Sequence, residues 1–201
     1  QKLVKVHEYD SIAVAHNQND SIETFFINLG RGTGISGLTG IQLVLGNVIR
    51  PLLFASRQDI EEYAGNNKIA YREDSSNASD KYLRNYIRHK VVPGLTDVFP
   101  NFRATMALNL DKLNETNLIY QHAVSVWIAK VTFEKDNFLY ITIAELQNTP
   151  APKTILFEIL KHNGFSSATV NEIYNVIYST SGKQFVSNTH KLIKDREHFI
   201  V

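Results

Sequence analysis

The apolar and polar positions at the start of the chain predict a strand followed by a helix. Residues 11–15 form a short apolar run that is typical of a buried parallel strand, and this run ends in a polar cluster. Over residues 22–29, apolar side chains recur at i, i+3, i+4 and i+7, which is the spacing of one helix face. Asp20 and Glu23 lie three residues apart, as in a capping box, so we expect the helix to begin near Asp20 and to end at Gly30.

The rest of the first half is expected to contain loops and two further helices. A glycine-dense loop covers residues 31–40, and the chain is extended before Pro51 because proline biases its predecessor away from the helical region. A helix is expected at 56–65, which opens on a serine with an aspartate three residues later. A polar loop at 72–80 then leads into a helix that should stop at its Pro-Gly pair, over residues 81–93.

The second half has a different pattern, dominated by a long stretch without proline. Residues 101–130 are expected to be helical with one break near 114–117. The other expected elements are a strand at 138–143, helices around 155–160 and 170–177, and short strands with a turn within 183–201. The fold class predicted is therefore an α/β part at 1–96, followed by a smaller, mostly helical α+β domain at 97–201. We expect the boundary between Pro93 and Pro100.

Composition narrows the class of protein. The chain has 201 residues, of which 43% are apolar and 20% charged, and these fractions exclude a disordered protein. With 21 Lys and Arg against 20 Asp and Glu, nucleic-acid binding would have to use local basic patches. The lack of cysteine excludes disulfides, thiolate metal sites and a cysteine nucleophile. No apolar run approaches the ~18 residues of a membrane span, and no signal-peptide core is present, so we expect a cytoplasmic protein without membrane contact. Because the chain begins with Gln1 inside a patterned segment, we expect a fragment.

The first candidate site is the polar turn after the first strand. In open α/β sheets, ligands bind beyond the carboxyl ends of the strands, where the next turn and helix N-terminus present polar groups. His16 and Asp20 lie at that point, and Glu23 and Thr24 would share a helix face with them. Alternatively, the asparagines and the aspartate of this turn only cap the helix, and His16 is a turn residue.

The glycine-dense loop is a weaker candidate. Gly32, Gly34 and Gly37 fit G-x-G-x-x-G, but they follow a helix, whereas a dinucleotide site needs a strand before the glycines and a helix after them. No Walker loop is present in the sequence either. The loop is therefore expected to serve as a connector that needs positive φ angles, although Arg31 at its start could reach an anion.

The third candidate is the basic row on the helix expected from residue 81. Lys81, Arg84 and Arg88 recur at i, i+3 and i+7, with Asn85 and His89 beside them. The other side of this helix is expected to be buried through Tyr82, Leu83, Tyr86 and Ile87, and Glu73 and Asp74 could hold the arginines in place. Such a row suits phosphate or a nucleic-acid backbone. The alternative is that it is only the solvated face of an amphipathic helix.

These segments occur in an order that resembles the tRNA(Ile)-lysidine synthetase family, which belongs to the PP-loop ATP pyrophosphatases. The resemblance rests on A-H-N-Q-N-D-S-I-E-T, R-G-T-G-I-S-G-L, I-R-P-L-L, R-E-D-S-S-N and R-N-Y-I-R-H-K-V-V-P, which run from about Ile12 to Pro93. The second half looks like the family's tRNA-contacting domain. The resemblance implies that the α/β part is the C-terminal remnant of a PP-loop parallel-sheet domain. The family's S-G-G-x-D-S loop is not in the sequence, and neither is its C-terminal domain, so we expect an internal piece that is inactive alone.

The family's chemistry is what the resemblance implies for the whole enzyme. ATP adenylates the wobble cytidine of an isoleucine tRNA, and free lysine then displaces AMP to form lysidine, with Mg²⁺ expected as well. The family pattern A-H-H-x-D-D-x-x-E-T puts the catalytic histidine on His16, the second aspartate on Asp20 and the lysine-holding carboxylate on Glu23. Asn17 and Asn19 depart from that pattern, at positions where the family has histidine and aspartate.

Two alternatives remain open at this point. One is another PP-loop enzyme that modifies tRNA, such as a thiolation enzyme, although those depend on cysteines and this chain has none. The other is a non-catalytic module that binds tRNA and has lost the ATP site. An S-G-G-x-D-S motif upstream of Gln1 would favour the ligase.

Overall fold

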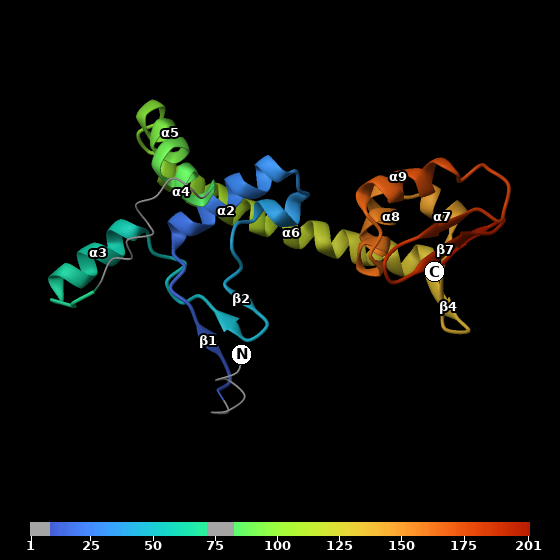
Figure 1. The fold of residues 1–201 in the computed structure, drawn as a ribbon, viewed down its shortest axis with the longest axis horizontal. Helices are drawn as coiled ribbons and strands as arrows, with labels where there is room; N and C mark the ends of the chain where they lie inside the picture. The colour runs from blue at the N-terminus through green and yellow to red at the C-terminus, as the bar shows by residue number, and fades with distance from the viewer. Residues whose placement is uncertain (1–8, 72–82) are drawn as a thin grey trace. The chain divides into compact units, whose positions relative to one another are not determined.

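The structure, a computed structural model, describes residues 9–71 and 83–201, and the chain divides into two compact units between Asn117 and Leu118 (Figure 1). The division lies inside one long helix, because the first part of that helix packs into the first core and its last part into the second. The domain boundary expected near residue 96 thus lies before this helix, and it stays a prediction.

The first unit contains a small three-stranded sheet of mixed direction. Strand β1 (Ile12–Ala13) pairs in parallel with β3 (Val48–Ile49), which pairs in antiparallel with β2 (Val44–Leu45). The strand predicted at 11–15 is therefore present and parallel. The turn that follows β1 leads directly into helix α2 (Gln18–Arg31), as the polar cluster indicated.

Helix α2 forms as predicted, but its ends differ. Asn17 is the N-cap, and the capping box joins Asn17 with Asp20, because the helix begins one turn earlier than expected. The expected pairing of Asp20 with Glu23 is therefore wrong. Gly30 does not end the helix either; Gly32 follows its last residue and has φ 77°. The apolar stripe of α2 packs against the first core through Ile22.

The next elements are the 3-10 turn η1 (Ile35–Leu38) in the glycine-dense loop and helix α3 (Arg57–Asn66). The capping box predicted at the start of α3 is confirmed, since Ser56 and Asp59 exchange hydrogen bonds. The polar loop predicted at 72–80, with Glu73, Asp74, Lys81 and Tyr82, lies outside the described residues.

The basic helix consists of α4 (Leu83–Tyr86), the π-helical turn η3 (Ile87–Val91) and α5 (Val92–Val98). Pro93 does not stop it, because Pro93 lies in the first turn of α5, where its missing N–H is tolerated. The predicted buried side is only partly correct: Ile87 is buried and makes the core contact, but Leu83 and Tyr86 are exposed.

Helix α6 (Phe102–Val131) is continuous, so the break predicted near 114–117 is wrong. Its polar side chains bond the carbonyls of the preceding turn and leave the backbone helical: Asn114 Nδ2 donates to the Leu110 carbonyl at 2.9 Å, and Thr116 Oγ1 to the Lys112 carbonyl at 2.8 Å. Among the described residues, no helix combines the length and apolar character needed to cross a membrane.

The second unit is built on a five-stranded antiparallel sheet with the strand order β4-β5-β8-β7-β6. The strands are β4 (Thr132–Lys135), β5 (Phe138–Thr142), β6 (Gln184–Val186), β7 (Lys191–Lys194) and β8 (His198–Ile200). Three helices complete the unit: α7 (Ile143–Gln147), α8 (Pro152–Leu160) and α9 (Ser167–Asn175). The predicted strand at 138–143, the two helices and the short strands of the tail are therefore present, and the unit is α+β.

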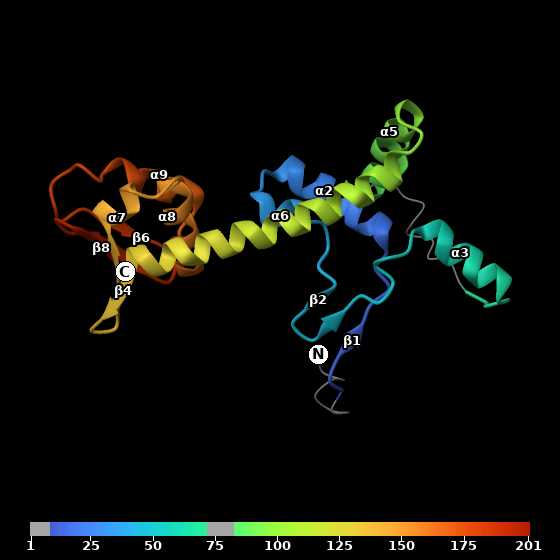
Figure 2. The same cartoon turned by 180° about the vertical axis from the view of Figure 1, so that it is seen from behind.

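The core of the second unit lies between one face of this sheet and the helices. Ile141, Leu192 and Phe199 are fully buried on that face, where they pack with apolar residues of α8 and α9. The hairpin that begins with β4 follows directly on the end of α6, and α8 and α9 lie side by side (Figure 2).

Candidate functional site

The N-terminal turn of α2 is fixed by hydrogen bonds that Asn17 and Asp20 exchange. Asn17 Oδ1 accepts from the backbone N–H of Asn19 at 3.0 Å and of Asp20 at 3.3 Å, while the Asn17 N–H donates to Asp20 Oδ2 at 2.9 Å. The start of α3 is attached here as well, since the Arg57 N–H donates to Asn19 Oδ1 at 3.1 Å. The capping interpretation of this turn is therefore correct as a description of its backbone.

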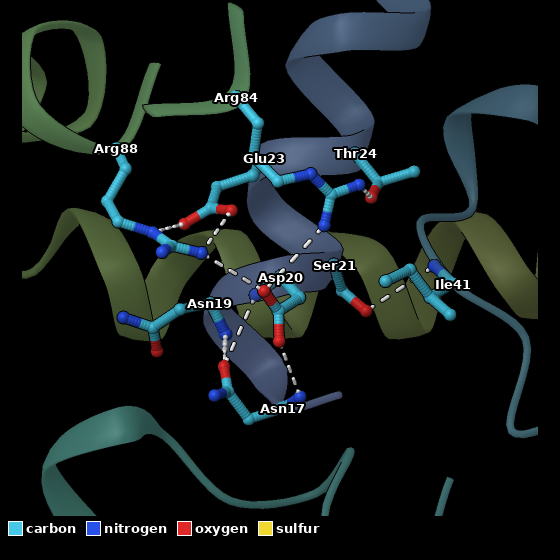
Figure 3. Close-up of polar contacts among 9 residues, drawn as sticks. All are labelled: Asn17, Asn19, Asp20, Ser21, Glu23, Thr24, Ile41, Arg84 and Arg88. Carbon is cyan, nitrogen blue, oxygen red and sulfur yellow. Dashed lines mark hydrogen bonds and ion pairs between the residues drawn. The ribbon is translucent and has the colours of Figure 1, made fainter. Parts of the chain in front are cut away.

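Carboxylates from the first turns of α2 form a cluster with arginines from the basic helix (Figure 3). Arg88 Nε donates to Glu23 Oε1 at 2.6 Å, and its Nη2 donates to Glu23 Oε2 at 2.9 Å and to Asp20 Oδ1 at 3.2 Å. The Glu23 side chain is only 3% exposed, whereas that of Arg88 is 32% exposed. Arg88 and Glu23 thus form a bidentate ion pair that joins α2 to the basic helix.

Arg84 extends this cluster along α2. Its Nη1 lies 3.7 Å from Asp20 Oδ1, and its Nη2 donates to Thr24 Oγ1 at 3.2 Å. Asn85 is buried beside it. The arginines of the predicted basic row are therefore held by Asp20, Glu23 and Thr24 of α2.

The electrostatic surroundings keep Arg88 cationic. The hydrogen bond that Arg88 donates to Glu23 raises the pKa of Arg88, the negative charges of Glu23 and Asp20 add to that increase, and desolvation opposes it. Arg88 is therefore a fixed positive charge at any physiological pH, and its exposed edge is available to an anion.

A cleft of about 430 Å³ opens beside this cluster. It is lined by Arg57, Arg88, Arg103, His89, Asp20, Ala15, Asn17 and Asn19. Three guanidinium groups around a single carboxylate make the cleft suitable for an anionic ligand such as phosphate.

Sequence reasoning missed Arg57 and Arg103. A signal for both is nevertheless present, because each lies in the first turn of a helix, where the helix dipole disfavours a positive charge. A cation at such a position weakens the helix slightly, which makes a role in binding a reasonable expectation.

Two of the predicted site residues lie apart from the cluster. His16 precedes α2 and is not on its helical face as expected; its Nδ1 is buried and has no hydrogen-bond partner among the described residues. Arg31 is exposed at the opposite end of α2, about 16 Å further along the axis than Asp20. The described residues contain no group of three or more His, Asp or Glu that could hold a metal ion.

Comparison with known proteins places the two halves of the chain in one family. A model described as PP-loop domain matches residues 1–95, and one described as TilS substrate binding domain matches residues 134–201. The chain is 40% identical over 186 residues to the tRNA(Ile)-lysidine synthase of Parabacteroides distasonis, which covers 92% of this chain and 42% of that protein. The synthase of Bacteroides thetaiotaomicron is 38% identical over 185 residues, with the same two coverages.

A more distant relative gives the same result. The tRNA(Ile)-lysidine synthase of Thermosipho africanus is 33% identical over 160 residues, which are 80% of this chain and 35% of that protein. The chain thus spans about two fifths of the length of curated relatives that it matches. The PP-loop match, the substrate-binding-domain match and the relatives agree, and the chain belongs to the tRNA(Ile)-lysidine synthetase family.

Proposed function

We propose that this chain is part of an enzyme that makes lysidine in an isoleucine tRNA. In the proposed reaction, the carbonyl oxygen of the wobble cytidine attacks the α-phosphorus of ATP, and pyrophosphate leaves. An amino group of free lysine then attacks the carbon that bears this oxygen, AMP leaves, and the amine gives up its protons. The observation that carries the proposal is the arginine-lined cleft beside Asp20, Glu23 and Arg88, found in a chain whose relatives are named tRNA(Ile)-lysidine synthase.

The cleft is proposed to bind the phosphate groups of this reaction. The charge on the transferred adenylate and on the leaving groups is best stabilised by cations already held in place. Arg88 meets this condition, because Glu23 and Asp20 fix its guanidinium group. Arg57 and Arg103 line the same cleft, as does His89.

Asp20 is proposed as the carboxylate that meets the lysine. It lines the cleft, and its side chain is 14% exposed. Glu23 is also proposed to orient the lysine, but both its oxygens bond to Arg88 and its side chain is buried. A direct contact between Glu23 and lysine therefore requires Arg88 to release one of its hydrogen bonds. Both oxygens of Asp20 are also bonded, to the Asn17 N–H and to Arg88, but its side chain is more exposed than that of Glu23.

His16 is proposed as the group that accepts a proton from the attacking amine. Its Nδ1 is not engaged by any described residue, so the imidazole is not committed to a structural hydrogen bond there. Thr24 and Asn85 are proposed to act on the substrates through Arg84, which Thr24 contacts directly. The contribution of Arg31 to substrate binding stays a prediction, and it would have to act away from this cleft.

Mg²⁺ does not fit this set of residues as a resident ion. Asp20 and Glu23 already bond to arginines, and the described residues contain no group of three or more potential His, Asp or Glu ligands. The proposed steps therefore use only the protein side chains and the substrates. The expectation of Mg²⁺ rests on the resemblance alone.

The test is lysidine formation by the complete protein that contains this chain. Purified protein is incubated with ATP, radiolabelled lysine and unmodified isoleucine tRNA, with the same tRNA carrying uridine at the wobble position as control. We expect label to enter only the cytidine-containing tRNA, with one AMP formed per lysine incorporated. Failure to incorporate lysine, or equal incorporation into the uridine control, would overturn the proposal.

The cleft can be tested in the same assay. Arg57→Ala and Arg103→Ala should raise the KM for ATP, and Lys112→Ala, which removes an exposed cation on another part of α6, should not. Equal KM values for all three variants would exclude the cleft as the phosphate site. The 201-residue chain by itself should form no AMP from ATP, because its sequence offers no glycine-rich loop between a strand and a helix.

A further inference from the structure

The sheet of the second unit has one face that its helices leave open. Residues directly opposite each other in neighbouring strands share a face. The register joins Phe133 to Tyr140, Tyr140 to Ile200, Ile200 to Ile193, and Ile193 to Gln184, so these five side chains lie on one face across all five strands. Their sequence neighbours Ile141, Phe199 and Leu192 are buried in the core on the other face. We call the face that carries Phe133, Tyr140, Ile200, Ile193 and Gln184 the open sheet face.

The open sheet face carries an ordered group of rings at one end. Phe133 and Tyr140 are stacked, with centroids 5.0 Å apart and planes 8° from parallel. The His198 ring meets both edge-on, at 5.5 Å from Phe133 and 5.8 Å from Tyr140. Phe133 is 44% exposed and Phe138 on the same face is 51% exposed. Rings that are fixed by one another and yet reach solvent present a flat π surface at little entropic cost.

Within the strands, the charged side chains on this face are positive, and the acidic Asp195 lies just beyond β7, where its N–H bonds to the His198 carbonyl. Lys135 is opposite Phe138, and Lys191 is two residues from Ile193, so both lysines belong to the open sheet face. None of the side chains that β4 to β8 direct to this face is Asp or Glu. The nearest acidic candidate in the strands, Glu134, is opposite Leu139, which packs against the core and therefore belongs to the other face.

We propose that the open sheet face binds unpaired nucleotides of RNA. Bases stack on the Phe133–Tyr140 pair, and Lys135 and Lys191 contact the backbone phosphates. Aromatic side chains with nearby cations are the features by which sheets hold single-stranded RNA, and stacking suits any base because every base has a π face. A purely apolar partner is less favoured, because the lysines and Gln184 interrupt the apolar surface. The inference rests on the proposed function in one respect: the RNA is taken to be the tRNA substrate.

The test measures binding of the complete protein to a fluorescent ten-nucleotide single-stranded RNA and to the same RNA annealed to its complement. Phe133→Ile and Tyr140→Ile remove a ring and keep a residue that favours strands. Phe133→Tyr keeps the ring, and Tyr178→Ala removes a 90% exposed aromatic residue outside the sheet. We expect the two isoleucine variants to bind single-stranded RNA about 5- to 100-fold more weakly, the loss typical of one stacked base. Phe133→Tyr and Tyr178→Ala should bind like the parent.

The contribution of the two lysines is tested separately, through the salt dependence of RNA affinity. Replacing both Lys135 and Lys191 by alanine should reduce the slope of log affinity against log salt by about 1.4, at roughly 0.7 per phosphate contact to a single strand. Unfolding midpoints of all variants are compared with the parent, and Phe133→Tyr shows whether a loss follows the ring rather than the fold. Parent-like binding by both isoleucine variants would overturn the inference, and so would equal losses for the single strand and the duplex. Loss of self-association or of binding to anionic lipid vesicles, with RNA binding intact, would assign the face to another partner and also overturn it.

Failure of this inference is distinguishable from failure of the proposed function. In the lysidine assay, the isoleucine variants should raise the KM for tRNA and leave kcat and the KM for lysine unchanged. If the parent makes lysidine and the variants have its KM for tRNA, the open sheet face is not a substrate site and the proposed function stands. If the parent makes no lysidine and the variants still lose single-stranded RNA, the RNA site stands and the proposed function fails.

Discussion

The ion pair between Arg88 and Glu23 should stabilise the fold far more than its hydrogen-bond length alone indicates. Arg88→Met removes the guanidinium group and leaves the Glu23 carboxylate, whose side chain is 3% exposed, without a partner. The pair of Arg57 and Glu61 has the same shortest distance, 2.6 Å, but both side chains are nearly half exposed. Arg57→Met is therefore a control that differs mainly in burial.

The structure sets the expected magnitudes. Breaking a buried ion pair typically costs about 3–5 kcal/mol, because a charge is left uncompensated. An exposed pair contributes about 1 kcal/mol or less. Since Arg88 is about one third exposed and Glu23 is buried, we expect Arg88→Met to lower the free energy of unfolding by about 2–3 kcal/mol. Arg57→Met should lower it by less than about 0.5 kcal/mol.

Urea unfolding of both variants, together with the Glu23→Met/Arg88→Met double variant, is the measurement. The double variant should be more stable than Arg88→Met alone, because it leaves no buried charge. Raising the pKa of Arg88 gives stability that is present below its unfolded value and is lost only in strong alkali. The effect should therefore not weaken between pH 6 and pH 9 through titration of Arg88. Equal losses for Arg88→Met and Arg57→Met would refute the reasoning that burial gives this pair its strength.

Three further predictions concern other parts of the chain. Gly40→Ala should cost about 1–2 kcal/mol in urea unfolding, because Gly40 has φ 76° and a Cβ there would lie 3.1 Å from Ser21; Gly34→Ala, in open space, should cost little. Burial, together with the hydrogen bond to Glu158, raises the pKa of Tyr120 to about 12. An ultraviolet titration should therefore show a tyrosine that ionises near pH 12 and is absent from Tyr120→Phe. The stability that this raised pKa contributes should be lost as pH rises from 10 through 12. His16→Ala in the complete enzyme should lower the rate of lysidine formation about 10²- to 10⁴-fold with little loss of stability. Asp20→Ala should lower both the rate and the stability, because Asp20 also caps α2.

Local signals in the sequence predicted most of the elements. The strand at 11–15, the capped start of α3 and the short strands of the tail depend on residues within a few positions of one another. Such short-range preferences act before any tertiary contact forms, which is why the sequence pattern is sufficient to locate these elements. The errors at Pro93 and near Asn114 have a common cause: both residues are unfavourable in the middle of a helix, and the structure places each where its backbone or side chain is satisfied.

The site was only partly predictable. Residue types and helical spacing identified Asp20, Glu23, Arg84 and Arg88 as candidates. The pairing of Glu23 with Arg88 joins residues 65 positions apart, and periodicity carries no information about which helices touch. For the same reason, the apolar anchor expected for the basic helix was only partly correct, since Ile87 alone of its described members is buried. In the structure, that helix meets α2 through the ion pairs of Arg88 as well as through the buried Ile87 and Val92, while Leu83 and Tyr86 remain exposed.

Asn17 shows how a departure from the family pattern can be understood physically. Where the family usually has a second histidine, this chain has an asparagine that is 9% exposed and accepts two backbone hydrogen bonds. Asparagine is among the best N-caps, and a cap of this kind is worth about 1 kcal/mol. Asn17 therefore stabilises the start of α2, and it contributes an amide where it lines the cleft. Among the described residues, His89 lines the cleft and His16 directly precedes this turn, which makes these two histidines the ones to compare as proton acceptors in the proposed reaction.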